Sequence, residues 1–365
     1  MQKVVVQLLR APAGGIRKHV LDIIDELSND KIKQIFITNI KESDVDLSYL
    51  AKNKNIEIHH LDIRESPGFS DFKNIINIYK ILKNKKVSVI HGHGAKGGLY
   101  ARVLAPCLRA KCVYTPHGGS LHRVHGKIKN IVYDIIEKMM MPVTDVLLFE
   151  SKYSSEIYKK NISDGGQKVL INYNGVGLPD SFSKSLYKAG EKMNFASFGL
   201  LRHLKGHDIF LEACHLLKNK NIPFSYTIYG SGDFEPELLN LIKKYNLQNE
   251  VKFFNYSPNV YQEMMKYDFI VHPSRFESFG YVPVEAMAVK VPVIASHEGG
   301  LKEVVDSYSG YIAYDNSPES YLKIVESLFQ GDPELESKIE HAYNRIQQLF
   351  SKKAMISNIE KVYLS

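Results

Sequence analysis

Two glutamates, Glu277 and Glu285, lie eight residues apart in a segment whose residue types suit ligand binding. The apolar run at residues 269–271 predicts a strand before them, and Pro283 suits the first turn of a helix, where its missing N–H is no loss. We therefore expect Glu277 in a loop and Glu285 in the first turns of the helix. The backbone amides of residues 279–281 would then be free at a helix N-terminus and could hold a phosphate.

Carboxylates that flank an anion site suit the recognition of hydroxyl pairs, because a carboxylate accepts hydrogen bonds from neighbouring ribose or sugar hydroxyls. The alternative is that Glu277 and Glu285 only complement the dipole of the helix. Because Glu277 precedes the helix and the amides lie between the two glutamates, the pattern favours ligand binding.

Two glycine pairs follow predicted strands but lack a specific nucleotide fingerprint. Gly14-Gly15 follows the apolar run at residues 4–9 and opens a helix, so its amides could approach an anion. A tight β–α turn explains the pair equally well. Neither this pair nor Gly230-Ser231-Gly232 extends to G-x-G-x-x-G, and the sequence contains no P-loop motif.

Fourteen histidines include two closely spaced pairs, His91 with His93 and His122 with His125. A metal site needs three or four convergent ligands, commonly joined by carboxylates or thiolates, and no acidic residue lies near these pairs in the sequence. Hydrogen-bonded loop histidines are the favoured interpretation, and we predict no bound metal.

Short apolar runs alternate with amphipathic helices along the whole chain, which predicts parallel sheets covered on both faces. A glycine- and proline-bearing stretch at residues 174–180, followed by polar residues 181–192, separates two such series. With 365 residues, the chain is predicted to form two α/β, doubly wound halves. The predicted strands are 4–9, 35–37, 56–58, 87–90, 112–114 and 146–149 in the first half, and 195–198, 226–229, 251–254, 269–271 and 291–295 in the second.

Positive charge is concentrated in the first half. Residues 1–180 contain 27 Lys and Arg against 18 Asp and Glu, whereas residues 181–365 contain 20 against 22. Residues 72–133 contain 12 basic residues and no acidic one. This implies an anionic partner (phospholipid, nucleic acid or a phosphorylated substrate), or else a solvated basic face. The chain has three cysteines, an odd number without the spacing of a disulfide framework, which suits a reducing cytoplasm.

At residues 277–285 the sequence resembles the retaining glycosyltransferases of family four, the glycosyl transferases group 1, which have the GT-B fold. Their signature is two glutamates separated by seven residues, with Phe-Gly and Glu-Ala-Met-Ala in register, as here. Further segments also resemble the family: residues 14–20, 115–118, 174–176, 292–296 and 298–305. The resemblance implies two Rossmann-like domains facing a central cleft. The acceptor domain would span residues 1–178, the donor domain 179–346, and a C-terminal helix at about 347–365 would pack on the first domain.

The resemblance also implies roles for individual residues. Glu277 and His117 would be the catalytic residues at the transferred sugar, and Glu285 would bind the ribose. Gly14 and Gly15 would lie under the pyrophosphate. Further donor contacts would come from Lys205 and from the backbone amides of Phe279, Gly280 and Tyr281. The sequence departs from the family at Leu200, where an arginine is usual, and Arg202 would replace it from a shifted position. It departs again at Asn255, where a glycine is common.

The implied function is retaining transfer of a hexose from a nucleotide-diphosphate sugar to a glycan or polyprenyl-linked glycan. A UDP-sugar is favoured, GDP-mannose is a second candidate, and bacterial surface polysaccharide or lipopolysaccharide is the expected product. The nucleotide sugar is a co-substrate, and no cofactor is expected, because lysine, arginine and amides can stabilise the diphosphate without a metal. The alternatives are a sugar-nucleotide epimerase, a phosphorylase, or a nucleic-acid-binding protein. No nucleic acid is expected as a partner, since no helix-turn-helix, RRM or zinc module occurs.

The basic stretch further predicts peripheral binding to the anionic, cytoplasmic face of the cell membrane, and hence a cytoplasmic protein. The basic side chains expected to share one face are Lys80, Lys83, Lys85, Lys86, Arg102, Arg109 and Lys111. The apolar Ile76, Tyr79 and Leu108 would lie beside them.

Overall fold

The computed structural model describes residues 2–118, 126–163, 166–179, 186–255, 257 and 259–365. His122 and His125, one of the two histidine pairs, lie outside these residues. The chain divides into two compact units. The first contains residues 1–174 and 352–365, and the second contains residues 175–351.

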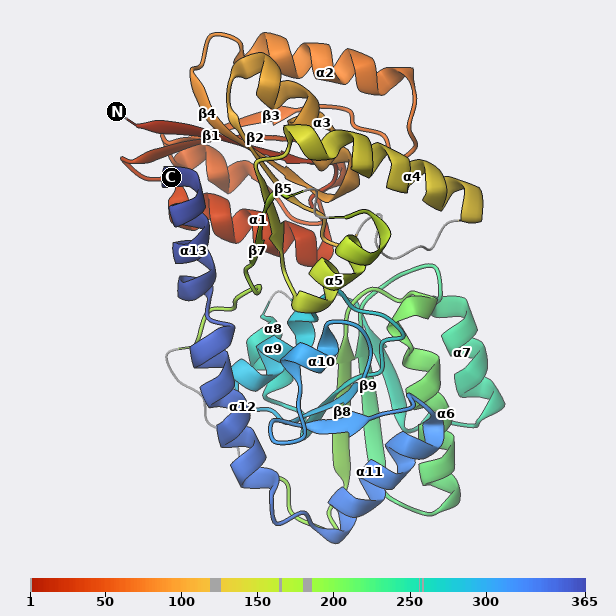
Figure 1. The fold of residues 1–365 in the computed structure, drawn as a ribbon. Helices are drawn as coiled ribbons and strands as arrows, with labels where there is room; N and C mark the ends of the chain where they lie inside the picture. Colours follow the sequence, from red (N-terminus) through yellow and green to blue (C-terminus); the bar gives the residue numbers. More distant parts are fainter. Residues whose placement is uncertain (1, 119–125, 164–165, 180–185, 256, 258) are drawn as a thin grey trace. The chain divides into compact units, whose positions relative to one another are not determined.

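The first unit is built on a parallel sheet in the order β3-β2-β1-β4-β5-β6-β7 (Figure 1). Its strands are β1 (Lys3–Leu9), β2 (Ile32–Thr38), β3 (Ile56–His60), β4 (Val87–His93), β5 (Lys111–Thr115), β6 (Val146–Phe149) and β7 (Lys168–Ile171). Its helices are α1 (Gly14–Leu27), α2 (Phe69–Leu82), α3 (Gly94–Leu108), α4 (Lys127–Met140), α5 (Lys152–Asn161) and α13 (Lys352–Leu364).

Helices cover both faces of this sheet, as the uninterrupted burial of residues 5–9 of β1 requires. Val6 packs in one core with side chains of α2 and α3, and its neighbour Val5 packs in another with side chains of α1 and α13. The C-terminal helix therefore completes the first unit. Its Tyr363 is buried, and the hydroxyl lies 3.0 Å from Nε2 of Gln7 on β1.

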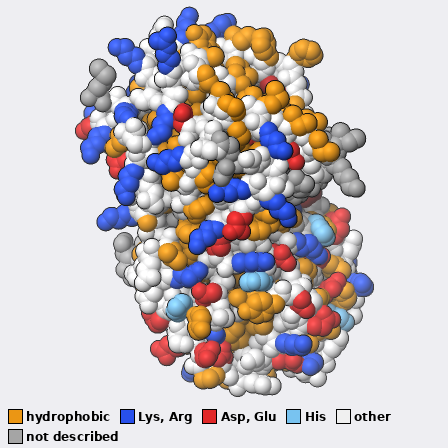
Figure 2. Space-filling model, in the orientation of Figure 1, with side chains coloured by type: hydrophobic (Ala, Val, Ile, Leu, Met, Phe, Trp, Pro, Cys, Tyr) orange, Lys and Arg blue, Asp and Glu red, His pale blue; other side chains and the backbone are white. Residues whose placement is uncertain are grey.

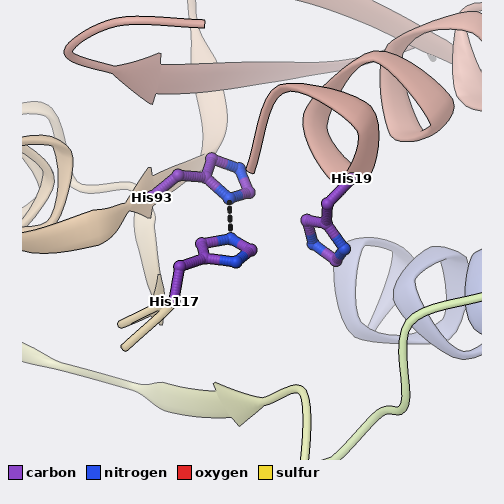
Figure 3. A group of neighbouring side chains, drawn as sticks. All are labelled: His19, His93 and His117. Carbon is purple, nitrogen blue, oxygen red and sulfur yellow. Dashed lines mark hydrogen bonds between the residues drawn. The ribbon is translucent and has the colours of Figure 1, made fainter. Parts of the chain in front are cut away.

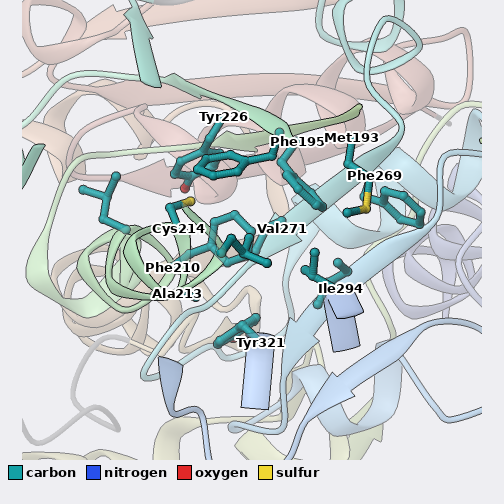
Figure 4. Close-up of a cluster of buried hydrophobic side chains, with 14 of the residues drawn as sticks. Met193, Phe195, Phe210, Ala213, Cys214, Tyr226, Phe269, Val271, Ile294 and Tyr321 are labelled. Carbon is teal, nitrogen blue, oxygen red and sulfur yellow. The ribbon is translucent and has the colours of Figure 1, made fainter. Parts of the chain in front are cut away.

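The second unit repeats the architecture with a parallel sheet in the order β10-β9-β8-β11-β12-β13. Its strands are β8 (Met193–Phe198), β9 (Phe224–Tyr229), β10 (Val251–Phe254), β11 (Phe269–His272), β12 (Val293–Ser296) and β13 (Tyr311–Ala313). Its helices are α6 (His207–Asn219), α7 (Glu235–Lys244), α8 (Val260–Met264), α9 (Tyr281–Ala288), α10 (Leu301–Val304), α11 (Pro318–Gln330) and α12 (Leu335–Leu349). Buried aromatic side chains, among them Phe195, Phe210 and Phe269, fill its core (Figure 4).

Both sheets have the Rossmann-like order 3-2-1-4-5-6 when the strands of each unit are counted from its own first strand, and the first sheet adds β7 at its edge. This confirms the predicted α/β, doubly wound fold. The order reverses between β1 and β4 in one unit and between β8 and β11 in the other. Ligands of such sheets bind beyond the carboxyl ends of the strands at this reversal, so the residues that follow these four strands are the first candidates for a site.

Candidate active site

In the second unit, Glu277 lies in the loop after β11, as the sequence predicts, and three side chains donate to its carboxylate. Lys205 forms an ion pair with its Oε1. Nε2 of His272 lies 2.9 Å from the same oxygen, and Oγ of Ser274 lies 3.1 Å from it. Because all three contacts meet Oε1, the Oε2 atom keeps its capacity to accept hydrogen bonds from a ligand.

The charge of Glu277 is well defined. Burial alone would raise the pKa of its carboxyl, but Lys205 and the hydrogen bond from His272 outweigh burial and lower the pKa far below the ordinary value. The group is therefore a carboxylate throughout the physiological range. Since its pKa is lower in the folded state, its contribution to stability is present above the unfolded pKa and is lost as the pH falls.

Contacts between two loops place Lys205 against Glu277. Arg275 donates to both carboxylate oxygens of Asp208, at 2.7 and 2.6 Å, and to the carbonyl of His203 at 2.7 Å. Gly206 has φ +69°, and a Cβ at this position would lie 1.9 Å from the carbonyl oxygen of Pro273. The turn that carries Lys205 therefore needs glycine to approach the loop after β11.

Two more glycines support the backbone of the Glu277 loop from the other side. The amide of Gly300 donates to the carbonyl of Glu277 at 2.8 Å. A Cβ on Gly299 would lie 2.1 Å from the carbonyl oxygen of Glu277, and a Cβ on Gly300 would lie 2.1 Å from that of Ser278. The Glu-Gly-Gly motif at residues 298–300 is thus a packing surface for the glutamate loop.

Gly300→Ala is accordingly expected to displace this loop, because its Cβ meets backbone that cannot rotate away. We expect a loss of about 1–3 kcal/mol of stability, the usual cost of overpacking, together with weaker nucleotide binding. Urea unfolding and a thermal-shift assay with UDP would measure both effects. Gly177→Ala is the matched control, since a Cβ there meets nothing within 4 Å; equal behaviour of the two variants would contradict the packing role.

The other donor residues predicted in this unit lie on α9, just before α9, or next to the turn that carries Lys205. Glu285 is half-buried on α9, which begins at Tyr281. Gly280 precedes the helix with φ +106°, and its absent Cβ would lie 2.6 Å from Cδ2 of Leu301. Phe279 is buried. The exposed Arg202 adjoins the turn of Lys205.

In the first unit, His117 follows β5 and belongs to a buried hydrogen-bond chain. Its Nδ1 lies 3.0 Å from Oε2 of Glu150, and the Nδ2 of Asn174 donates to that same oxygen at 2.9 Å. Burial would raise the pKa of Glu150, but His117 and Asn174 lower it overall, so the group is a carboxylate. Glu150 and Asn174 thus orient the ring of His117.

The other ring nitrogen of His117 faces a second histidine. Nε2 of His117 lies 3.1 Å from Nδ1 of His93, and the ring of His19 lies edge-on to His117 at 4.7 Å between centroids (Figure 3). His93 ends β4 and His19 belongs to α1, so the cluster lies at the strand-order reversal. His91 and His93 are therefore strand residues, and the prediction that they are loop residues is wrong.

At the start of α1, the predicted anion position is occupied by a side chain of the chain itself. The amide of Gly14 donates to Oδ2 of Asp44 at 2.9 Å, and Arg17 forms an ion pair with Asp44. Gly14 has φ +61°, and Gly15 is exposed. The structure therefore confirms the β–α turn at these glycines, whereas a pyrophosphate contact stays a prediction.

The predicted basic face is partly wrong. Arg102 is 1% exposed and forms an ion pair with Glu137, with Nη1–Oε2 and Nη2–Oε1 distances of 2.6 and 3.1 Å. It belongs to the core and cannot contact a membrane. Two others are half-buried, Lys85 in an ion pair with Glu57 and Lys111 donating to the carbonyl of Val362. The exposed members are Lys80, Lys83, Lys86 and Arg109.

Comparison with known proteins agrees with this architecture. The glycosyl transferases group 1 profile matches residues 180–345, and the glycosyltransferase family 4 profile matches residues 13–178. An uncharacterized glycosyltransferase of Methanocaldococcus jannaschii is 29% identical over 361 residues, covering 96% of this chain and 94% of that protein. The UDP-Gal:α-D-GlcNAc-diphosphoundecaprenol α-1,3-galactosyltransferase of Escherichia coli is 25% identical over 309 residues, covering 80% of this chain and 79% of that one.

Among solved structures, HepE of Anabaena in complex with UDP and glucose has a TM-score of 0.80 and 18% identity, and the match covers 100% of both chains. Two Rossmann-like units of this kind define a GT-B protein. The chain belongs to the glycosyl transferases group 1 and is a glycosyltransferase. The predicted family is thereby confirmed.

Proposed function

We propose that the protein is a retaining hexosyltransferase that uses a nucleoside-diphosphate sugar, with a UDP-sugar favoured over GDP-mannose. The observation that carries the proposal is the geometry of Glu277: among the described residues, Lys205, His272 and Ser274 all contact Oε1, so Oε2 can accept from sugar hydroxyls. Glu285 would accept the ribose hydroxyls from α9. The name of the galactosyltransferase relative supports UDP as the nucleotide.

In this mechanism the developing charge of the diphosphate is stabilised by Lys205, Arg202 and the amides of residues 279–281, without a metal. Lys205 would exchange part of its contact with Glu277 for the phosphate oxygens. The acceptor hydroxyl would attack from the face that the diphosphate leaves, and its proton would pass to the leaving phosphate. His117, oriented by Glu150, would contact the transferred sugar.

The acceptor is proposed to be a glycan, either free or linked to a polyprenyl diphosphate. The names of two relatives contain a lipid-linked acceptor. One names GlcNAc-diphosphoundecaprenol, and the other names a diacetylbacillosaminyl-diphospho-undecaprenol glycan. The product would be a cell-surface polysaccharide.

A thermal-shift panel of UDP, GDP, ADP and their sugars tests the donor class. We expect UDP to stabilise the protein by about 2.7 kcal/mol at 100 times its dissociation constant. Glu285→Ala is expected to weaken UDP binding by about 1.5–3 kcal/mol for each charged hydrogen bond lost. Glu336→Ala, at an exposed position on α12, is the control. Unchanged UDP affinity in Glu285→Ala would contradict the proposal that Glu285 binds the ribose. Stabilisation by GDP alone would show that the donor nucleotide is GDP and not UDP.

We further propose that the first unit binds an anionic membrane surface, where a lipid-linked acceptor is presented. Apolar side chains are exposed on two of its helices: Phe69 and Phe72 on α2, at 99% and 70%, and Ile131, Ile135 and Met139 at four-residue spacing on α4. Orange hydrophobic side chains gather over this part of the unit in Figure 2. The exposed lysines Lys80, Lys83 and Lys86 lie at or just beyond the end of α2 and supply the charge complementarity. None of the described helices is long and apolar enough to cross a membrane.

Liposome co-sedimentation checks this proposal. We expect binding to anionic but not neutral vesicles, with release at about 0.5 M salt as screening shortens the Debye length. Phe69→Ser/Phe72→Ser should weaken binding, whereas Tyr308→Ser, at an exposed aromatic side chain of the second unit, should not. Absence from both kinds of vesicle, with full activity on a water-soluble glycan, would contradict a membrane role.

A further inference from the structure

His19, His93 and His117 form a buried cluster of which the proposed transfer mechanism uses only His117. One ring nitrogen from each residue lies within 4.8 Å of the other two. His19 and His93 are each 1% exposed, and the side chain of His117 is 4% exposed. The three rings come from α1, β4 and the loop after β5, so the fold itself brings them together (Figure 3).

The hydrogen-bond network determines which nitrogen of His93 carries its proton. The Nε2 of Gln34 donates to the carbonyls of Ile23 and Ile24 at 3.0 and 3.2 Å. Its Oε1 therefore accepts from Nε2 of Gln7 at 2.7 Å, which turns Oε1 of Gln7 toward His93. That oxygen lies 2.8 Å from Nε2 of His93 and must accept from it. Nδ1 of His93 consequently presents a lone pair.

The same accounting applies to His117. Its Nδ1 donates to the carboxylate of Glu150 at 3.0 Å, so in the neutral ring Nε2 presents a lone pair. This lone pair faces Nδ1 of His93 at 3.1 Å. Two lone pairs at this distance repel each other unless a proton or a metal ion lies between the two nitrogens. His19 adds a third ring that can ligate a metal, because neither of its buried nitrogens makes a hydrogen bond of ordinary geometry among the described residues, although the side chain of Asn174 lies near the ring.

We propose that His19, His93 and His117 form a binding site for a first-row transition metal ion, with Zn²⁺ as the best fit. Three neutral imidazoles are a zinc donor set, and a Zn–N bond of about 2.0–2.1 Å places tetrahedral nitrogens about 3.3 Å apart. The pair His93 and His117 already has nearly this spacing, and His19 needs an adjustment of about 1.5 Å at most.

The surroundings of the cluster match those of a metal site. Ligating histidines usually donate their second N–H to a carboxylate or carbonyl oxygen, as His117 does to Glu150 and His93 does to Gln7. Burial and the neighbouring His117 lower the pKa of His19 to about 3, so its ring is neutral and able to ligate. The three protein ligands leave a fourth coordination position for water or another ligand.

This proposed site is separate from the donor diphosphate, for which the proposed mechanism needs no metal. An ion bound here would occupy Nε2 of His117, the atom that faces the cluster. If His117 contacts the transferred sugar as proposed, the ion would compete with the donor, and zinc would inhibit transfer. Binding of the ion itself does not depend on that assignment.

The test uses the full-length chain, without an affinity tag and dialysed against a chelator. Co²⁺ serves as the spectroscopic probe because tetrahedral Co²⁺ absorbs visible light, and Zn²⁺ is titrated by calorimetry. We expect one ion per chain, with affinity lowered more than about 100-fold in His19→Ala and about 10–100-fold in Glu150→Gln. His341→Ala, at an exposed histidine of α12, is the matched control and should bind as the unmodified chain does.

Three results would overturn the proposal. The first is no ion bound to the unmodified chain. The second is equal weakening in His19→Ala and His341→Ala, which would indicate binding by surface histidines. The third is a ¹⁵N spectrum in which His117 is doubly protonated and unaffected by Zn²⁺, because a proton would then bridge the two rings.

Circular dichroism establishes that each variant is folded, and His19→Asn replaces His19→Ala if the alanine variant fails to fold. Co²⁺ binding without zinc inhibition would support the metal site and contradict the role of His117 in transfer.

Discussion

Glu277→Gln is expected to lower kcat by roughly 10²–10³-fold, the usual cost of removing one preorganised electrostatic contact to the reacting centre. Glutamine keeps the length of the side chain and an oxygen that can accept from His272. It loses the negative charge that holds Lys205, and it replaces Oε2, which has no hydrogen-bond partner among the described residues, with a hydrogen-bond donor. The loss should fall on kcat more than on KM, because the contact to the transferred sugar strengthens as positive charge develops on it.

Transfer from the nucleotide sugar identified by the thermal-shift panel measures this effect. Glu340→Gln is the matched control, since Glu340 is an exposed glutamate of the same unit that also pairs with a lysine, Lys290. A kcat within twofold of the unmodified enzyme in Glu277→Gln, with UDP binding retained, would exclude Glu277 from the reacting centre.

The sequence predicted the glutamate segment in detail because its signals are local. A buried strand ends at His272, and the helix begins at Tyr281 with Pro283 in its first turn, as strand and helix propensities require. The parallel sheets with helices on both faces follow from the alternation of strands and helices, whereas the order of the strands is known only from the structure. The short edge strands β7 and β13 escaped prediction. Each contains an apolar run of only three residues, at 169–171 and 311–313, and a run this short does not by itself distinguish a strand from other buried structure.

The histidine cluster could not be predicted, since its members lie on segments far apart in the chain. The oxygens of Gln7 and Glu150 that orient His93 and His117 come from β1 and from the residue after β6. Nothing in the local sequence of either residue distinguishes it from an ordinary strand-end polar residue. The Rossmann strand order is the signal that points to this cluster: β1 and β4 are neighbours at the reversal of strand order, and His93 ends β4.

The absence of acidic residues from 72–133 predicts Arg102 at the surface, but its partner Glu137 lies just beyond that stretch of the sequence. Glu137 on α4 accepts from Arg102 and also from the hydroxyls of Tyr114 and Tyr158, each at 3.0 Å. The guanidinium lies over the ring of Tyr114, 4.2 Å from its centroid. A charge count along the sequence cannot detect this pairing, because helices α3 and α4 bring the partners together only in the fold.

Arg102→Met is therefore expected to destabilise the first unit by about 3–5 kcal/mol, because it leaves the carboxylate of Glu137 buried without its cation. For a unit of this size the unfolding midpoint should fall by about 2–4 °C for each kcal/mol. Far-UV circular dichroism follows the transition, since the chain contains no tryptophan.

Two variants test whether the loss comes from the buried ion pair. Arg109→Met removes an exposed arginine just after the same helix, and should change stability by less than about 0.5 kcal/mol. Arg102→Met/Glu137→Gln should recover part of the loss, because glutamine is neutral and still accepts from the tyrosine hydroxyls. Arg109→Met, unlike Arg102→Met, should also weaken vesicle binding if the exposed basic residues face the membrane. Equal, small effects of the two single substitutions on the free energy of unfolding would contradict a buried ion pair and would indicate that Arg102 is exposed.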